Sequence, residues 1–311
     1  MDPLSDVLSL LKPRNHMAAA FDAAGEWSIQ FVDQQHSIKC GAVANGRCWL
    51  TVEGVAAPVL LDTGDCFLLP AGRPFRMATD LGLAPVEARQ IFPPARSGGI
   101  VTRNGGGEFF LVSARFMLEG AHAGILLGLL PPIIHIRDAA GQAALRWSVE
   151  RMIEEMRDPQ PGGFLLVRHH AHMVLLQALR LHLSALAGGV GWLFALGDRQ
   201  IGTAIAAIHG DPARRWTLPD LAAVSGMSRS AFALRFKEMV GSSPMEYLTR
   251  WRMLLAGDRL ANSGDAVSSI ALSLGYESES AFSTAFKRVM GCPPRSYARR
   301  GRSSTASLRG S

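Results

Sequence analysis

Two groups of residues near the C-terminal end of the chain carry side chains suited to hydrogen bonding with flat, polar partners. An arginine guanidinium donates two parallel hydrogen bonds to acceptors such as guanine O6 and N7, and a glutamate carboxylate accepts from an amine such as that of cytosine. Hydroxyl groups serve either purpose, and apolar groups can contact a thymine methyl. The candidates for such base contacts are Arg229, Ser230, Ala233 and Leu234 in the first group, and Glu279, Ser280, Ser283 and Thr284 in the second.

The two groups occupy equivalent places in a pattern that occurs twice. Residues 230–250 and 280–300 share Ser-Ala-Phe, Phe-Lys, Gly, Pro, Tyr and Arg at a constant offset of 50 residues. Just upstream, residues 221–226 match residues 270–275 at an offset of 49, so the second copy has one extra residue in its turn. A repeat of this length indicates one supersecondary unit that is used twice.

Each copy has the pattern of two helices joined by a tight turn. In the first copy a short helix with one apolar face leads to Gly226, a residue that permits the left-handed conformation at a helix end. Ser228 follows as an N-cap of the second helix, and Gly275 and Ser278 take these places in the second copy. This is the helix-turn-helix, whose second helix enters the DNA major groove. The aromatic residues expected in its core are Phe232, Phe236, Phe282 and Phe286.

The distribution of charge agrees with a polyanionic partner. Residues 211–311 contain 15 Lys and Arg against 8 Asp and Glu, whereas the first 210 residues contain 17 against 18. A basic excess confined to one domain favours binding to phosphates, which positions a protein on DNA without specifying sequence. The candidate phosphate contacts are Arg235, Lys237, Arg250, Arg252, Lys287, Arg288 and Arg295.

This stretch resembles the DNA-binding domain of the AraC/XylS family of bacterial transcription regulators. The segments that carry the resemblance are Trp216–Ala222, Gly226–Phe232, Ser243–Leu248, Ile270–Ser278 and Ala281–Pro294. They cover about the last third of the chain. The resemblance implies an all-α domain in which two helix-turn-helix subdomains are joined by a long helix, here from about Pro244 to Asn262. It also implies double-stranded promoter DNA and RNA polymerase as partners.

Residues 26–115 have a different character, with short β-prone runs separated by Gly, Pro, Asn and Asp clusters. Many short strands at this spacing predict a small β-barrel or sandwich. The run from Leu61 to Gly72 is similar to the second half of a cupin barrel, in which a Gly-Asp turn precedes a buried strand that ends in Pro. Cupin-type sensor domains occur at the N-termini of AraC-family regulators. We therefore expect a multidomain α+β chain that begins with a cupin-like β-barrel.

The sequence departs from the metal-binding cupins. Those proteins have a paired-His motif followed by Glu, whereas here His36 stands alone and Phe75 follows Arg73-Pro74. We therefore expect neither a metal nor another cofactor, and no enzyme activity. The alternative is a cupin enzyme with incidental affinity for DNA, which would need a metal triad that the sequence lacks.

A small barrel can hold one ligand in its mouth, so we expect this domain to sense a signal. The candidate wall residues are Trp27, Phe31, His36, Trp49, Phe67, Phe75 and Arg76. The alternative is a core filled by these side chains. A second alternative is a redox switch at Cys40 or Cys48, which requires an exposed thiolate with a lowered pKa. Cys66 lies in an apolar run that favours an inert thiol.

Helices are expected between the two domains. Residues 164–187 repeat Leu and His at steps of four and three, a heptad spacing that would make a seam for a second protomer or for packing within one chain. We place the cupin-like domain at 1–137, a helical dimerisation and linker region at 138–210, the DNA-binding domain at 211–300 and a disordered tail at 301–311. No apolar run reaches the ~20 residues of a membrane span, and no signal peptide is apparent, which favours the cytoplasm.

Overall fold

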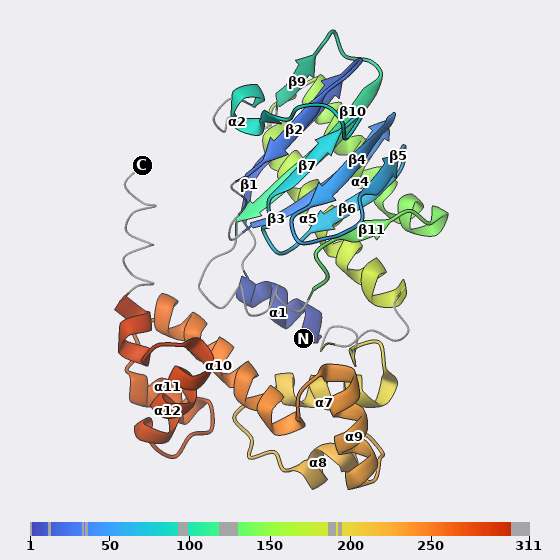
Figure 1. Ribbon diagram of the computed structural model, residues 1–311. Helices are drawn as coiled ribbons and strands as arrows, with labels where there is room; N and C mark the ends of the chain where they lie inside the picture. Colours follow the sequence, from blue (N-terminus) through green and yellow to red (C-terminus); the bar gives the residue numbers. More distant parts are fainter. Residues whose placement is uncertain are drawn as a thin grey trace. The chain divides into compact units, whose positions relative to one another are not determined.

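The computed structural model describes residues 2–11, 14–32, 34, 37–92, 99–117, 130–185, 191 and 195–299. The chain forms two compact units (Figure 1). A sheet unit comprises residues 13–118 and 130–185, and a helical unit comprises residues 1–12, 119–129 and 186–311. His36 and the tail 301–311 lie outside the described residues.

The sheet unit contains two β-sheets. The larger sheet has the order β11 (Ile134–Ile136), β6 (Cys66–Leu69), β3 (Ser37–Asn45), β10 (Phe109–Met117), β1 (Arg14–Ala23) and β9 (Gly99–Arg103). The smaller has the order β5 (Val59–Asp62), β4 (Arg47–Val52), β7 (Phe75–Ala78), β2 (Ser28–Phe31) and β8 (Val86–Glu87), which runs into the short helix α2 (Ala88–Ile91). Neighbouring strands are antiparallel, except that β9 and β8 each lie parallel to their partners.

The described strands do not close into a barrel, so of the barrel and the sandwich that the strand spacing predicted, the two-sheet arrangement is the one observed. The described strands form two separate hydrogen-bonded sheets with an apolar core between them. Within the described part of the chain, each sheet has two free edges, β9 and β11 in the larger sheet and β5 and β8 in the smaller, and none of these edge strands pairs with a strand of the other sheet. The Gly64-Asp65 turn takes the place before β6 that the sequence predicted for it.

The buried Asp65 carboxylate organises this turn. It accepts a hydrogen bond from the Asp62 amide at 3.0 Å and lies 2.9 Å from His135 Nε2. It also accepts from Gln142 Nε2 at 3.1 Å. One carboxylate thus joins the turn to β11 and to the first turns of α4 (Ala139–Arg157).

The two faces of the larger sheet have different surroundings, because successive residues of a strand point to opposite sides. Val112 and Ala114 of β10 face Val149 and Met152 of α4. Helix α5 (Gly163–Ala185) packs beside α4, and Figure 1 shows both helices on one side of the sheet. Leu111, Ser113 and Arg115 therefore point to the other side, toward the smaller sheet.

The helical unit contains α1 (Pro3–Leu11), α7 (Arg199–Gly210), α8 (Leu218–Val224), α9 (Arg229–Val240), α10 (Pro244–Asn262), α11 (Val267–Ser273) and α12 (Glu279–Met290). Helix α10 has the bounds that the sequence predicted for the long connecting helix. The expected core aromatics Phe232, Phe236, Phe282 and Phe286 are each 0% exposed, which confirms their assignment. No helix within the described residues is long and apolar enough to cross a membrane.

Candidate functional site

The first helix-turn-helix consists of α8, a turn at Gly226 and α9. Thr217 and Asp220 form a capping box at the start of α8, which satisfies two backbone N–H groups. Gly226 has a φ of +64°, a conformation that disfavours side chains larger than hydrogen. The Ser228 hydroxyl then accepts from the Ala231 amide at 3.4 Å and begins α9. The glycine turn and the serine N-cap were predicted from the sequence, and they determine the direction in which α9 leaves the turn.

The second helix-turn-helix repeats this geometry with α11, Gly275 and α12. Gly275 has a φ of +78°, and the Ser278 hydroxyl accepts from the Ala281 amide at 3.2 Å. Gly241 and Gly291 end α9 and α12 in the same left-handed conformation. The duplication seen in the sequence is therefore a duplication of backbone geometry.

The predicted base-contact residues lie on the N-terminal halves of α9 and α12. Arg229, Ser230 and Leu234 are exposed, Ala233 is half-buried, and the Leu234 side chain has 62% of its surface exposed. On α12, Ser280 and Thr284 are exposed, and Glu279 and Ser283 are half-buried. Ser230 and Leu234 on α9, and Ser280 and Thr284 on α12, lie on the side of their helix away from its buried phenylalanines. Arg229 is exposed at the first turn of α9.

The predicted phosphate contacts fall into two kinds. Lys237, Arg250, Lys287 and Arg288 are exposed and have no ion-pair partner among the described residues. The others have partners within the unit: Arg235 pairs with Asp198 at 2.5 Å, and Arg295 lies 3.4 Å from Glu279.

Arg252 is occupied more fully. Its guanidinium donates to the carbonyls of Pro212 at 2.6 Å and Arg214 at 2.9 Å, and to that of Ala213 at 3.4 Å. We therefore assign Arg252 to packing of α10 against residues 212–214.

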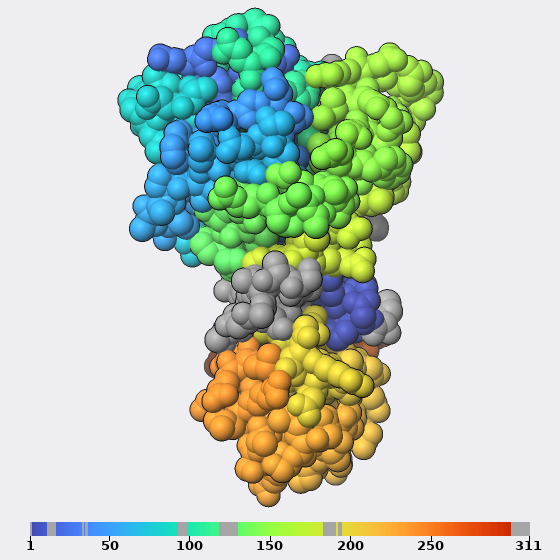
Figure 2. All heavy atoms as spheres, turned by 90° about the vertical axis from the view of Figure 1, so that its right-hand side faces the viewer, coloured from blue at the N-terminus to red at the C-terminus, as the bar shows by residue number. Residues whose placement is uncertain are grey.

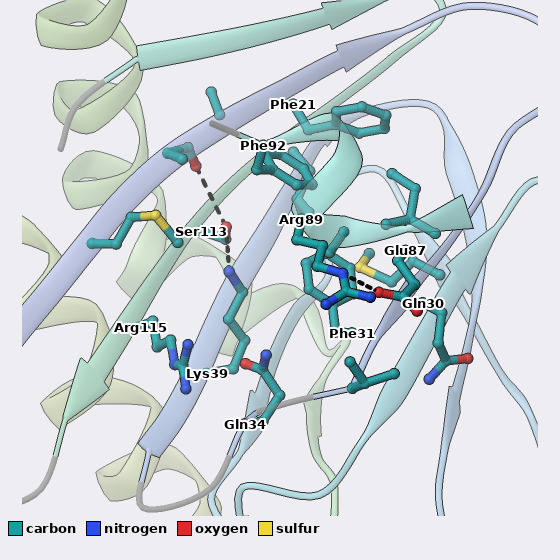
Figure 3. A pocket seen from close by; sticks show the side chains of 18 of the residues that line it. Phe21, Gln30, Phe31, Gln34, Lys39, Glu87, Arg89, Phe92, Ser113 and Arg115 are labelled. Carbon is teal, nitrogen blue, oxygen red and sulfur yellow. Dashed lines mark hydrogen bonds and ion pairs between the residues drawn. The ribbon is translucent and has the colours of Figure 1, made fainter. Parts of the chain in front are cut away.

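The sheet unit contains a cavity of about 410 Å³ between its sheets (Figure 3). Of the predicted wall residues, Trp27 and Phe31 line it. Trp49, Phe67, Phe75 and Arg76 are absent from the lining. Phe67 and Phe75 fill the apolar core, and Arg76 donates to Ser28 Oγ at 2.8 Å and to the carbonyls of Leu81 and Leu83.

Seven polar residues that line the cavity were not among the predicted wall residues: Gln30, Gln34, Lys39, Glu87, Arg89, Ser113 and Arg115. Lys39 is only 8% exposed, and its Nζ donates to Ser113 Oγ at 3.0 Å. Arg115 is directly opposite Lys39 in the pairing of β3 with β10. The available signal was a charged residue inside each of two largely apolar strands, Lys39 in β3 and Arg115 in β10.

Comparison with known proteins follows the same two-part division. A cupin family model matches residues 2–184, and a helix-turn-helix domain model matches residues 221–300. A putative AraC-like transcription regulator from Streptomyces lividans is 41% identical over 281 residues, which are 90% of this chain and 92% of that protein. The chain belongs to the AraC-like transcription regulators.

Other members of the family and one solved structure are also similar. The regulator AlkR of Acinetobacter baylyi is 29% identical over 289 residues, covering 90% of this chain and 93% of that protein. The solved DNA-binding domain of AdpA, in complex with a target DNA, is 29% identical, covers 34% of this chain and 96% of that chain, and has a TM-score of 0.33. This AraC-like chain is thus a DNA-binding transcription regulator with a cupin-type N-terminal domain, a combination consistent with ligand sensing.

The geometry of this AraC-like regulator gives no support to the redox alternative. Cys40 and Cys48 are buried, and burial raises the pKa of Cys40 to about 12 and that of Cys48 further still. Burial also raises the pKa of Cys66 to about 12. A buried thiol with a raised pKa has little thiolate at neutral pH and reacts slowly with oxidants.

The enzyme alternative likewise has no support. The relatives of this chain are transcription regulators. Within the described residues, no group of three His, Cys, Asp or Glu side chains is arranged to hold a metal ion.

Proposed function

We propose that α9 and α12 are recognition helices that enter two major-groove segments of promoter DNA. The observation that carries this proposal is the equivalent presentation of two exposed N-terminal helix faces over two fully buried phenylalanine pairs. Arg229, Ser230, Ala233 and Leu234 would read one segment, and Glu279, Ser280, Ser283 and Thr284 the other. Lys237, Arg250, Lys287 and Arg288 would contact phosphates, with Arg235 and Arg295 as further phosphate contacts once their carboxylate partners are exchanged.

The test begins with the sequencing of DNA fragments that co-purify with the full chain, which supplies a binding site. Arg229→Ala should then cost about 1–3 kcal/mol on that site and relax the preference at one base pair, because a bidentate base contact is lost. Fluorescence anisotropy on the site and on single-base variants measures both effects. A uniform loss on all sequences would show that Arg229 contacts only phosphate.

We further propose that the sheet unit binds a small effector in its cavity and that the regulator acts without catalysis, in the cytoplasm, through contact with RNA polymerase. Effector binding can change DNA binding only if the effector prefers one of two arrangements of the protein. We keep the functional division that the sequence indicates, with sensing in residues 1–137, dimerisation and linkage in 138–210 and DNA binding in 211–300. Titration of an effector into the DNA complex would show the predicted change in DNA affinity.

Pairing of two protomers through the 164–187 helix is also proposed. Leu165, Met173 and Leu176 of α5 have 54%, 42% and 39% of their side-chain surfaces exposed. Figure 2 shows lime-green atoms of the α4 and α5 region on the surface of the sheet unit. Leu179, however, is only 3% exposed, so at this position the heptad residue packs within the chain and is not available to a second protomer. A Leu165→Glu/Leu176→Glu variant that sediments as the wild type does would exclude this interface.

A further inference from the structure

The cavity of the sheet unit has an uneven distribution of charge. Lys39 and Arg115 are cross-strand partners on β3 and β10, and both side chains line the cavity. Figure 3 shows them at one end, with Ser113 beside Lys39. Like charges placed directly opposite each other on a sheet are destabilising. Arg115 is held by other contacts, among them a hydrogen bond from its Nε to Ser37 Oγ at 3.1 Å.

The charged ammonium group of Lys39 is buried, where little water can solvate it. Among the described residues no carboxylate lies within ion-pair distance of its ammonium group, whose hydrogen-bond acceptor is the neutral Ser113 hydroxyl. The cavity carboxylate Glu87 pairs instead with Arg89. Burial, with a smaller contribution from the Arg115 charge, lowers the pKa of Lys39 to about 8, so Lys39 is still mainly protonated at neutral pH. An uncompensated buried cation is costly to folding, and an anion would remove that cost.

The remainder of the cavity is mostly apolar and aromatic. Phe21, Trp27, Ile29, Phe31, Phe92 and Leu111 line it. The volume of about 410 Å³ lies within the range of ligand sites in proteins. A ligand complementary to these walls has one anionic end and a compact apolar body.

We propose that the effector of this regulator is a small organic acid whose carboxylate lies between Lys39 and Arg115 and whose apolar body fills the aromatic part of the cavity. This inference rests on the proposed sensing function of the sheet unit. A carboxylate matches the guanidinium fork of an arginine and the point charge of a lysine. Its single charge also suits a site in which an arginine and one lysine face each other.

The experiment uses the full chain and isothermal titration calorimetry with octanoate and 4-phenylbutyrate, each compared with a neutral analogue, octanol or 4-phenylbutanamide. The acids should bind and the neutral analogues should bind at least about tenfold more weakly, since charge-assisted hydrogen bonds are lost. Octyl phosphate is included as a second anion. If octyl phosphate binds tenfold more tightly than octanoate, or if octanol matches octanoate, the carboxylate assignment is overturned.

Three variants locate the site. Lys39→Met and Arg115→Gln should each weaken octanoate at least about tenfold, whereas Arg47→Gln, at an exposed cation on the smaller sheet, should leave its affinity unchanged. Lys39→Met should also raise the melting temperature of the ligand-free chain by about 2–4 °C, because a buried charge is removed. A purely structural lysine would instead give a lower melting temperature, and that result overturns the proposal, as does the absence of binding by either acid at millimolar concentration.

DNA affinity measured in the same samples separates this inference from the proposed sensing function. Acid binding that depends on Lys39 but leaves DNA affinity unchanged would support the cavity assignment and contradict sensing. A change in DNA affinity that is equal in the wild type and in Lys39→Met would support sensing and place the acid at another site, which overturns the assignment.

Discussion

The two helix-turn-helix units share one scaffold but differ in how that scaffold is held. Both have a glycine turn, a serine N-cap and two buried phenylalanines in the recognition helix. Helix α8 begins with the Thr217–Asp220 capping box, whereas Ala266 at the start of α11 offers no side-chain hydrogen bond. The first unit is therefore secured by local hydrogen bonds that the second unit lacks.

The second unit is held instead by a segment that precedes the first. The Gly275 turn packs against the carbonyl of Ala213, and Arg252 of α10 binds the carbonyls around it. Arg215 of the same segment pairs with Glu277, which lies two residues after Gly275. The Gly226 turn has no atom within 4 Å of the position of an added Cβ. The duplicated units are thus not independent, because the turn of the second depends on residues 212–215.

The largest expected difference between the units is at these two glycines. Gly275→Ala should destabilise the helical unit by about 2–4 kcal/mol, because a Cβ would meet the Ala213 carbonyl oxygen well inside van der Waals distance in addition to the strain of a positive φ. Gly226→Ala has the same strain without the clash and should cost about 1 kcal/mol. Urea unfolding followed by circular dichroism compares them, and equal losses would mean that the Ala213 contact is unimportant.

A buried histidine makes the stability of the first helix-turn-helix unit more sensitive to acid than that of the second. His209 of α7 stacks on Trp251 at 3.8 Å, and its Nε2 lies 2.8 Å from the Tyr247 hydroxyl. Burial lowers its pKa to about 3 from the ordinary 6.5. The unfolded chain therefore takes up a proton first, so this contribution to stability is complete above about pH 6.5 and is lost as the pH falls toward 3, at up to about 1.4 kcal/mol per pH unit. Residues 211–311 contain no histidine.

The variant His209→Phe should flatten the pH dependence of unfolding between pH 6.5 and 4. Asp6, whose carboxylate lies 3.4 Å from His209 Nδ1, works in the opposite direction because burial raises its pKa. Asp6→Asn should consequently steepen the loss of stability at low pH in a chain that retains His209. Urea midpoints at several pH values give both slopes, and an unchanged slope in His209→Phe would contradict the assignment.

Arg250 and Arg252 are two residues apart on α10 and point to different sides of the helix, so they separate DNA contact from structure. Arg252→Met should cost about 2 kcal/mol of stability, because three carbonyls lose a charged donor. Arg250 is exposed, so Arg250→Met should leave stability unchanged and reduce the slope of log affinity for DNA against log salt by about one. If Arg252→Met also reduces the salt slope while the fold is intact, Arg252 contacts phosphate after all.

These contrasts also show which features a sequence can reveal. The helix-turn-helix units were predictable because their determinants are local: Ser228 and Ser278 as caps, and Gly226 and Gly275 as turns, lie within a few residues of the helices they begin or end. The dependence of Gly275 on Ala213 was not predictable, because it spans 62 positions of the chain and is made by a backbone carbonyl.

The cavity was harder to predict for a related reason. Trp27 and Phe31 were recognised as wall residues, but Phe67 and Phe75 are equally aromatic and lie in the filled core. The Lys39–Arg115 pair exists only through the register of β3 with β10, which is a long-range property. Closure of a barrel is also decided by strand pairing, which explains why short strands and turn signals favoured a barrel where the described strands form two sheets.

The smallest expected effect concerns the caps. Thr217→Ala removes a capping box and should destabilise α8 by about 1 kcal/mol, whereas Ala266→Ser supplies the missing hydroxyl and should stabilise α11 by about 0.5–1 kcal/mol. Hydrogen exchange of peptides from α8 and α11 resolves the two effects. If Ala266→Ser slows exchange in α11 and also leaves the cost of Gly275→Ala unchanged, capping and the Ala213 contact act independently on the second unit. If Ala266→Ser instead makes the loss of stability in Gly275→Ala smaller, the missing cap of α11 is the reason that the second helix-turn-helix unit depends on residues 212–215.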